Sequence, residues 1–398
     1  MTPGSQLLIL INNPQYCKMN WKFWNKKNTP KNTNKKKKSA TREWVDAIVF
    51  AVIAATLIRT FFIEAYVIPT PSMERSLLVG DFLFVSKVNY GARTPMTPIA
   101  FPFAHHTLPL TGTKAYWDGW ELSYHRLPGF SSVKPGDVVV FNYPADTINN
   151  RPVDKRENYI KRCQGISGDT VSVVDGQVYV NRKAAPNPPG EQMEYTFRTV
   201  GEDLNPQIEN DLNITLYEGH SAKAMTQASA NILKSYSNVK DFAPIISQKG
   251  ISDPQNPVFP KSSTSIIDVK LTQNLPDYHW SVDNYGPIII PKKGWTVKLD
   301  SLTFPIYERA IKVYENNKLE VKGTDIYING VKTDSYTFKM NYYWMMGDNR
   351  HDSEDSRYWG FVPEDHIVGK ALFVWMSWDE NASFFHKIRW SRLFMGIH

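Results

Sequence analysis

The feature that most constrains this chain is one apolar run near its N-terminus, Trp44–Ile63. A helix rises about 1.5 Å per residue, so a run of this length covers about 30 Å, the hydrocarbon thickness of a bilayer. Its charged residues, Asp46 and Arg59, lie near its ends, where they can reach the membrane interface. The run therefore predicts a single membrane-spanning helix.

Positive charge gathers on one side of this run. Ten basic residues and one acid precede Trp44, so the tail carries a formal charge of +9; the whole chain carries +7, which leaves −2 for the rest. Basic residues on one flank of an apolar run mark its cytoplasmic side. This pattern predicts that the N-terminus lies in the cytoplasm and that everything after Ile63 lies outside it.

Three other interpretations of this region fit less well. A basic arm for nucleic acid would not explain why the charge stops at an apolar run, so we expect a lipid bilayer and no nucleic acid as partner. A cleaved signal peptide with the core Ala47–Ile58 would need a site of small residues after Ile58, and none follows. A buried helix of a soluble domain leaves the one-sided lysines unexplained. Whether the short apolar pieces within residues 7–24 touch the membrane stays open.

The cysteines and histidines do not indicate a metal site. Cys17 and Cys163 lie on opposite sides of the predicted span, so they cannot form a disulfide within the chain or a shared metal site. The doublet His105-His106 lacks the spacing of metal ligands and is interpreted as part of a loop or an interface. No metal or cofactor is expected.

The residues after the run are mostly β in pattern. Short segments rich in Val, Phe and Tyr are bounded by Gly, Pro and Asp, as in Phe82–Lys87, Asp137–Tyr143, Thr170–Val174 and Gln177–Asn181. Asp175-Gly176 predicts a tight hairpin between the last two. The best helical pattern is Ala222–Leu233. We therefore predict a mainly β fold in which the transmembrane helix precedes a β-rich catalytic domain with an inserted, smaller subdomain.

Composition suggests the domain boundaries. Glu191–Leu275 is polar, rich in Asn and Ser, and without a recognisable catalytic pattern, so it is interpreted as the inserted subdomain. Pro95–Pro109 is apolar and broken by prolines; it is either a loop packed on the core or an apolar rim at the bilayer surface. The predicted domains are a basic cytoplasmic tail (residues 1–43), the transmembrane helix (44–63), the first part of the catalytic core (64–190), the insert (191–275) and the second part of the core (276–398).

Ser72 is the candidate nucleophile. It lies in Ile68–Asp81, directly after the predicted span, in the sequence Ile-Pro-Thr-Pro-Ser-Met-Glu-Arg-Ser-Leu-Leu-Val-Gly-Asp. A serine needs a base to attack an amide. No histidine of the chain lies in a recognisable triad context. A lysine is the other option, provided that burial lowers its pKa enough to leave it neutral.

Lys161 is the candidate base. It follows the bulky pair Tyr159-Ile160, which suits a β-strand, and a Gly-x-x-Gly-Asp turn comes after it. From this stretch alone, a surface lysine beside Arg162 is the more probable interpretation. The segment Met346–Val362 adds a loop of turn residues, acids and arginines in which an Asp355–Arg357 pair clamps the chain and Ser353 can bond a neutral amine. Its Asp spacing does not fit a calcium loop.

Taken in order, these stretches resemble the signature boxes of bacterial signal peptidase I, the membrane-bound leader peptidase. The serine box of that family reads roughly Pro-Ser-x-Ser-Met-x-Pro-Thr-Leu-x-x-Gly-Asp, and Pro69–Asp81 is similar to it. Further similar stretches are Asp137–Phe141, Lys161–Asp169, Gly347–Val362 and Arg389–His398. The resemblance covers about Trp44–Asn181 and Tyr285–His398. It departs at Glu74-Arg75-Ser76, where the family has x-Pro-Thr, at Ser167, where it has proline, and at Thr70, where many members have serine.

The resemblance implies roles for matching residues. Ser72 would be the nucleophile, Lys161 the general base, and Ser353 the residue that orients the lysine. The Ser72 N–H and the Thr70 hydroxyl would form the oxyanion hole. The implied structural supports are Asp355, Arg357, Asp348 and Arg162, and the implied walls of small apolar substrate pockets are Ile68, Pro69, Met73, Leu77, Tyr159 and Ile160.

The resemblance thus implies a single-pass serine endopeptidase of the bacterial cytoplasmic membrane. Its catalytic domain would lie on the outer side and remove signal peptides from exported preproteins after small residues of the Ala-x-Ala type. A catalytically inactive, membrane-anchored binding or scaffold relative is the alternative, although the retention of Ser72 and Lys161 argues against it. A soluble self-cleaving repressor also carries a Ser-Lys pair, but the anchor and the lack of a DNA-binding helix pair argue against that.

Overall fold

The structure is a computed structural model, and it describes residues 39–398 except 109–110, 147–150, 202, 217–221 and 266–274. The chain divides into two compact units, Met1–Ala51 and Val52–His398. Most of the predicted cytoplasmic tail lies outside the described residues. Helix α1 (Ala40–Phe61) covers the predicted span except for its last two residues, and it is long and apolar enough to cross a membrane.

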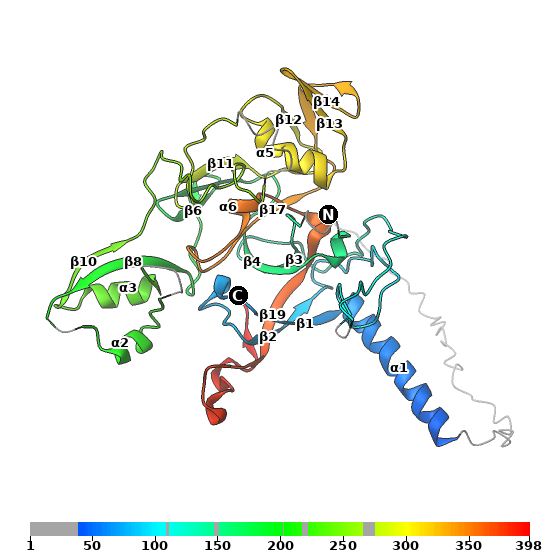
Figure 1. Ribbon diagram of the computed structural model, residues 1–398, viewed down its shortest axis with the longest axis horizontal. Helices are drawn as coiled ribbons and strands as arrows, with labels where there is room; N and C mark the ends of the chain where they lie inside the picture. Colours follow the sequence, from blue (N-terminus) through cyan, green and yellow to red (C-terminus); the bar gives the residue numbers. More distant parts are fainter. Residues whose placement is uncertain (1–38, 109–110, 147–150, 202, 217–221, 266–274) are drawn as a thin grey trace, which may run out of the picture. The chain divides into compact units, whose positions relative to one another are not determined.

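The central element of the second unit is an antiparallel sheet with the strand order β1-β2-β19-β3-β4-β17-β18, to which β20 adds beside β19 (Figure 1). Its strands are β1 (Ile63–Val67), β2 (Asp81–Ser86), β3 (Val138–Asn142), β4 (Asn158–Gly165), β17 (Tyr342–Met346), β18 (Val362–Pro363), β19 (Ile367–Ser377) and β20 (Met395–Gly396). Every pair in the sheet is antiparallel.

Both faces of this sheet are buried in its middle, which explains the continuous apolar run of β3. Because side chains alternate along a strand, Val138 and Val140 enter one core with Leu83, whereas Val139 and Phe141 enter the other. Short helical turns close the connections: η1 (Pro71–Met73), η2 (Val153–Lys155), α6 (Ser356–Trp359), η4 (Glu364–His366), η5 (Phe384–His386) and η6 (Trp390–Arg392).

Smaller sheets share a third and larger core. They have the orders β11-β5-β6-β7, β12-β16 and β13-β14-β15. Their elements are β5 (Thr170–Val174), β6 (Gln177–Val180), β7 (Lys183–Ala184), β11 (Tyr285–Ile289), β12 (Thr296–Lys298), α5 (Phe304–Arg309), η3 (Ala310–Tyr314), β13 (Leu319–Lys322), β14 (Asp325–Ile328), β15 (Val331–Lys332) and β16 (Ser335–Thr337). The four strands expected from the sequence are confirmed to within one residue at each end, and Asp175-Gly176 forms the expected turn.

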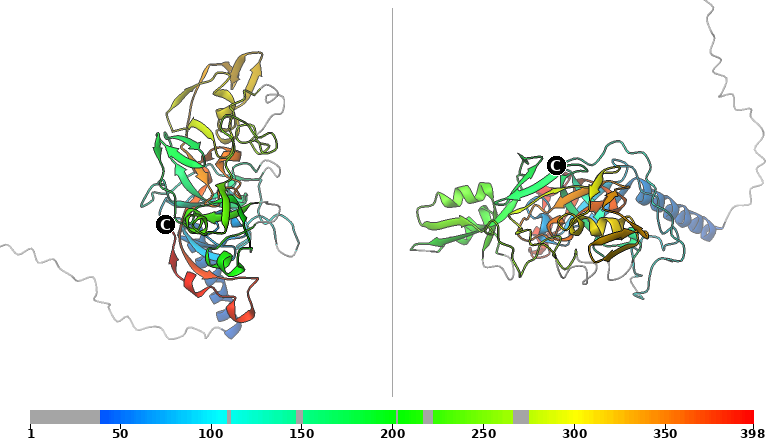
Figure 2. Two further views of the ribbon diagram at one scale, coloured as in Figure 1. Left: turned by 90° about the vertical axis from the view of Figure 1, so that its left-hand side faces the viewer. Right: turned by 90° about the horizontal axis from the view of Figure 1, so that it is seen from above.

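The first part of the predicted insert folds around its own small core. Strands β8 (Gln192–Thr199), β9 (Lys223–Thr226) and β10 (Val239–Pro244) pair in the order β10-β8-β9, with α2 (Pro206–Asp211) and α3 (Gln227–Lys234) nearby (Figures 1 and 2). The predicted helix Ala222–Leu233 is half wrong, because its first residues form β9. Thr226 ends this strand and caps α3 by accepting a hydrogen bond from Ser229 N.

The predicted apolar segment Pro95–Pro109 does not pack fully on the core. Phe101 and Phe103 are 62% and 55% exposed, and Trp117 and Trp120 in the following loop are more than half exposed. The Phe101 N–H donates to the carbonyl of Ala115, which joins the two stretches. Of the two interpretations offered by the sequence, an exposed apolar rim fits these residues better than a packed loop.

Candidate functional site

The candidate nucleophile lies in a short helical turn. Ser72 is the second residue of η1, and Pro71 before it suits the first position of a helix because it has no N–H to satisfy. Ser72 is 8% exposed. Its N–H belongs to the first turn, where N–H groups lack a partner within the helix. The Thr70 hydroxyl lies 3.4 Å from Ser72 Oγ, so both predicted oxyanion-hole groups belong to one short stretch.

The chain after Ser72 folds back on itself. Ile68 N donates to Asp81 O, and Gly80 N donates to Ile68 O, both at 2.9 Å. Gly80 has φ +85°, and a Cβ there would lie 1.9 Å from the Trp378 carbonyl oxygen, so only glycine fits. Ser72 is therefore carried by a closed loop between β1 and β2.

Lys161 reaches this serine from the middle of the main sheet. It lies on β4, opposite Val139 of β3, and is 3% exposed. Its Nζ is 2.5 Å from Ser72 Oγ, although the two residues are 89 positions apart. Burial lowers the pKa of Lys161 to about 8, and the nearby carboxylates Asp355 and Glu354 offset part of that effect. The predicted base and nucleophile are thus in contact.

Aromatic rings cover the amine on one side. Lys161 Nζ lies 5.7 Å from the centre of the Tyr159 ring. Tyr159 stacks on Tyr143 with ring centres 4.5 Å apart, and Trp359 meets Tyr159 edge-on at 5.5 Å. The Tyr159 ring, held by the other two, contributes to the burial of the amine, and burial is the main cause of its lowered pKa.

The six predicted pocket residues differ in exposure. Pro69 is exposed, and Tyr159 and Ile160 are partly exposed beside Ser72 and Lys161. Ile68 is 3% exposed, whereas Met73 and Leu77 have no exposed surface and belong to the core beneath β2. In this structure Met73 and Leu77 pack under the site as core residues. The surface that a substrate can reach comes from Pro69, Tyr159 and Ile160.

A buried ion pair holds the loop of residues 347–357, called here the 347–357 loop. Asp355 Oδ1 accepts from Arg357 Nε at 2.9 Å, and Oδ2 accepts from Nη2 at 2.8 Å. Burial alone would raise the pKa of Asp355, but the charge and hydrogen bonds of Arg357 hold it below its usual value. Arg357 also donates to Arg350 O at 2.6 Å, which closes the loop on itself.

Ser353 lies beside the pair formed by Ser72 and Lys161 without bonding the amine. Its hydroxyl donates to Asp355 Oδ2 at 3.0 Å, and no hydrogen bond joins it to Lys161 among the described residues. A Cβ on Gly347 would lie 2.2 Å from Ser353 Oγ and 2.5 Å from Ser72 O, so both serines pack against Gly347. The lysine-orienting role of Ser353 stays a prediction.

Asn349, which sequence reasoning missed as a site residue, clamps the nucleophile loop. Its N–H donates to Ser72 O at 3.2 Å, and its side-chain Nδ2 donates to Pro71 O at 3.2 Å. Asn349 is 1% exposed, so these bonds are shielded from water. Its place in the Gly-Asp-Asn-Arg motif was the available signal, but no pattern shows which distant carbonyl an amide will bond.

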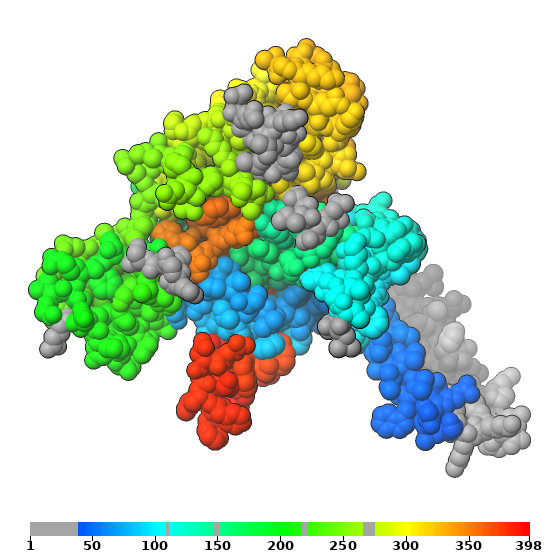
Figure 3. Space-filling view, viewed as in Figure 1, coloured from blue at the N-terminus to red at the C-terminus, as the bar shows by residue number. Residues whose placement is uncertain are grey.

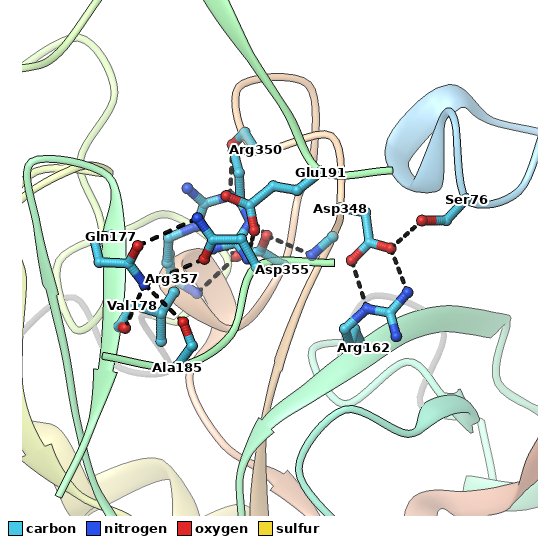
Figure 4. A network of polar contacts seen from close by, with 12 residues as sticks. Ser76, Arg162, Gln177, Val178, Ala185, Glu191, Asp348, Arg350, Asp355 and Arg357 are labelled. Atoms are coloured by element: carbon cyan, nitrogen blue, oxygen red, sulfur yellow. Dashed lines mark hydrogen bonds and ion pairs between the residues drawn. The ribbon is translucent and has the colours of Figure 1, made fainter. Parts of the chain in front are cut away.

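A second buried pair joins all three stretches. Arg162 donates to Asp348 Oδ1 at 2.9 Å and to Oδ2 at 2.7 Å, and Ser76 Oγ donates to the same Oδ2 at 2.5 Å (Figure 4). Arg162 Nη1 further donates to the backbone oxygens of Gly136 and His398. Ser76 and His398 were not predicted as site residues. Ser76 keeps the hydroxyl of the family's threonine at this position, which was a usable signal.

This arrangement is suited to acyl transfer. A hydroxyl touches an amine whose pKa is low enough for a substantial neutral fraction near neutral pH, and the Thr70 hydroxyl lies 3.4 Å from the same serine oxygen. Within the described part of the chain, no group of three or more His, Cys, Asp or Glu side chains is placed to hold a metal ion.

Comparison with known proteins gives a consistent result. A family model described as signal peptidase, peptidase S26, matches residues 41–234 and 316–378. The chain is 28% identical to signal peptidase I of Buchnera aphidicola subsp. Acyrthosiphon pisum, over 83% of this chain and 73% of that protein. It is 25% identical to signal peptidase I of Pseudomonas aeruginosa, over 84% of this chain and 70% of that protein.

The limits of the family match differ from those expected. The sequence placed Glu191–Leu275 outside the resemblance, whereas the family model extends through residue 234 and leaves out 235–315. The sheet β10-β8-β9 therefore lies mostly within the matched region.

We expect the Asp355–Arg357 pair to be a major source of stability. Arg357→Ala would leave a buried carboxylate uncompensated, so the free energy of unfolding should fall by about 3–5 kcal/mol. The matched control is Arg198→Ala, which removes an exposed pair with Asp241 and should cost less than about 1 kcal/mol. Denaturant unfolding in detergent, followed by tryptophan fluorescence, measures both. Equal losses would contradict this prediction.

Proposed function

Because this chain belongs to the signal peptidase family, peptidase S26, we propose that Ser72 and Lys161 cleave the peptide bond that ends a signal peptide. Its family makes the chain a serine endopeptidase that processes signal peptides. The observation that carries the assignment of residues is the 2.5 Å contact between Ser72 Oγ and Lys161 Nζ, made where burial lowers the pKa of the lysine.

The proposed reaction has two stages. Neutral Lys161 takes the proton of Ser72 as Oγ attacks the scissile carbonyl carbon, and the Ser72 N–H and Thr70 hydroxyl stabilise the oxyanion. The intermediate then collapses, Lys161 donates its proton to the departing amine, and the signal peptide stays attached to Ser72 as an ester. A water molecule, deprotonated by Lys161, hydrolyses this ester and regenerates the serine.

The surrounding contacts support this geometry. Asn349 fixes the backbone of Ser72, and Asp355 holds Gly347 and Ser353 against it. Because reacting groups must stay aligned within a fraction of an ångström, such buried clamps are part of the proposed machinery. Pro69, Tyr159 and Ile160 border Ser72 and Lys161 and would restrict the residues before the cut to small side chains, as an Ala-x-Ala site provides.

Membrane anchoring is the second part of the proposal. Helix α1 has the length and hydropathy of a single span, and the lysines before it favour a cytoplasmic N-terminus. The protein would then be a type II protein of the bacterial cytoplasmic membrane, with residues 64–398 on the outer side. The exposed Phe101, Phe103, Trp117 and Trp120 are residue types that lie at membrane interfaces.

Removing either member of the proposed catalytic pair should abolish processing. Ser72→Ala and Lys161→Ala should each lower kcat/KM by at least about 10³-fold, because a nucleophile and its base act as a unit. Cleavage of a purified preprotein, with thermal unfolding as a check of folding, measures this. Lys183→Ala, at an exposed lysine on β7, is the control and should cleave normally. Substantial cleavage by folded Lys161→Ala would rule out its role as base.

Activity should rise with pH through the titration of Lys161. Its pKa is lowered from the usual value near 10.5 to about 8, and only the neutral amine accepts a proton, so kcat/KM should fall about tenfold per pH unit well below 8. Above pH 8 it should approach a plateau. Initial rates at low substrate concentration from pH 5 to 10 measure the profile. A flat profile would contradict the assignment.

The proposed topology predicts which cysteines can be labelled. Cys17 lies in the proposed cytoplasmic tail, and Cys163 is fully buried. A membrane-impermeant maleimide added to intact spheroplasts should therefore label Val331→Cys, at a residue 67% exposed, but label Cys17 only after lysis. The control is the Cys17→Ser form of Val331→Cys. Labelling of Cys17 before lysis would contradict the proposed topology, because it would place the N-terminus outside the cytoplasm or show that the chain is not anchored.

A further inference from the structure

A pocket of about 410 Å³ lies directly beside the 347–357 loop. One wall is formed by residues 351–354 of that loop and by Tyr358, and the opposite wall by residues 255–257 and 262–264. Figure 3 shows the orange surface of this loop region next to the yellow-green surface of the second wall. The volume is in the range of ligand pockets in proteins.

The second wall is held firmly against the 347–357 loop. Phe259 N donates to Arg357 O at 2.7 Å, and the hydroxyl of Ser262 donates to Tyr358 O. Ser262 is 3% exposed, so this contact is shielded from water. The pocket is therefore a built feature, and its second wall lies in residues 235–315, outside the family match.

Contacts link the pocket to the proposed catalytic pair. Ser353 lines the pocket, and it packs against Gly347 together with the backbone oxygen of Ser72. Glu354, also on the wall, accepts a hydrogen bond from the Tyr143 hydroxyl at 3.0 Å. Tyr143 stacks on Tyr159, the ring beside the Lys161 amine, so a series of side-chain contacts connects the pocket to the amine.

The chemistry of the reaction indicates which part of a substrate lies along these contacts. After the attack, Lys161 must deliver its proton to the departing amine, so the residues after the scissile bond leave on the side of Ser72 that faces Lys161. Glu354 lies on that side, since its charge acts on the Lys161 amine. The residues before the cut are expected near Pro69 and Ile160, on the nucleophile loop and β4.

The pocket walls favour polar and basic side chains. Exposed amides and a hydroxyl are supplied by Gln255, Asn256 and Ser263, and an exposed carboxylate by Glu354. His351 lines the pocket too, but it is paired with Asp283 at 2.9 Å. The rim thus presents more negative than positive charge to an incoming chain.

We propose that this pocket receives the first residues of the mature protein, which follow the cut, and that Glu354 favours a basic side chain among them. The proposal rests on the proposed function and deepens it, because it assigns the leaving side of the same site. It makes Glu354 a specificity residue that contacts substrate, with no role in the proton transfers.

The test compares two peptide substrates that are identical through the cut and differ only in the second and third residues after it, Lys-Lys or Gln-Gln. For the unaltered full-length protein in detergent, kcat/KM for the Lys peptide should be about two- to fivefold higher, the size expected of an exposed ion pair. In Glu354→Gln the ratio should fall to about one. Because each ratio is taken within one variant, a change in the pKa of Lys161 cancels.

Two further variants sharpen the result. Glu320→Gln, at a partly exposed hairpin acid on β13, should keep the ratio of the unaltered protein. Ser263→Trp, which fills the pocket, should slow the Gln peptide severalfold relative to a peptide that ends in an amide one residue after the cut. Three results would each overturn the proposal. The first is a Lys/Gln ratio of one in the unaltered protein, and the second is a ratio in Glu354→Gln that equals that of the unaltered protein. The third is no effect of Ser263→Trp on the Gln peptide. A failure of the proposed function would be recognised by a different result, because the Ser72→Ala variant would then still cleave the Gln peptide.

Discussion

The desolvation of one amine is the constraint on which the site depends. A lysine in water keeps its proton at neutral pH and cannot act as a base. In this structure Lys161 lies between β3 and β17, with an aromatic ring on one side and Ser72 on the other, and its pKa falls to about 8. The sheet supplies this environment, because a side chain at the middle of a central strand has neighbours on every side.

Three nearby acids, Asp355, Glu354 and Asp348, favour the charged form of Lys161. Glu354 is exposed to water and accepts a hydrogen bond from Tyr143. The buried carboxylates of Asp348 and Asp355 are each bound by an arginine through two hydrogen bonds, so their charge is largely balanced. The two ion pairs therefore have two effects: they fasten the 347–357 loop beside Ser72, and they limit the attraction between carboxylates and the amine.

Residues of the predicted insert contact this site on two sides. Arg75 follows the nucleophile turn and donates to Asn213 and Thr215 at 2.8 and 3.0 Å. At the other end, Arg350 of the 347–357 loop forms a buried pair with Glu191 at 2.6 Å (Figure 4). Arg75 stands where the related family has proline, so this connection belongs to a departure from the family pattern. Segments without catalytic residues thus border the proposed catalytic pair.

The sequence by itself determined the features that depend on residues close together along the chain. Alternation and turn residues located four strands and the Asp175-Gly176 hairpin, and the apolar run located α1. The motifs also singled out Ser72 and Lys161. The helix expected at Ala222–Leu233 was half wrong because β8 pairs with its first residues, and that pairing is not a local property.

Tertiary structure alone decided which of these residues meet, and how far each is removed from water. The 2.5 Å contact between residues 72 and 161 and the clamp by Asn349 arise from strand pairing and loop closure over long sequence separations. Three further features follow from packing. Met73 and Leu77 are fully buried, the Ser353 hydroxyl donates to Asp355, and the pKa of Lys161 is lowered. Composition fixes the chemical groups available, but desolvation and geometry depend on atoms that only the folded chain brings together.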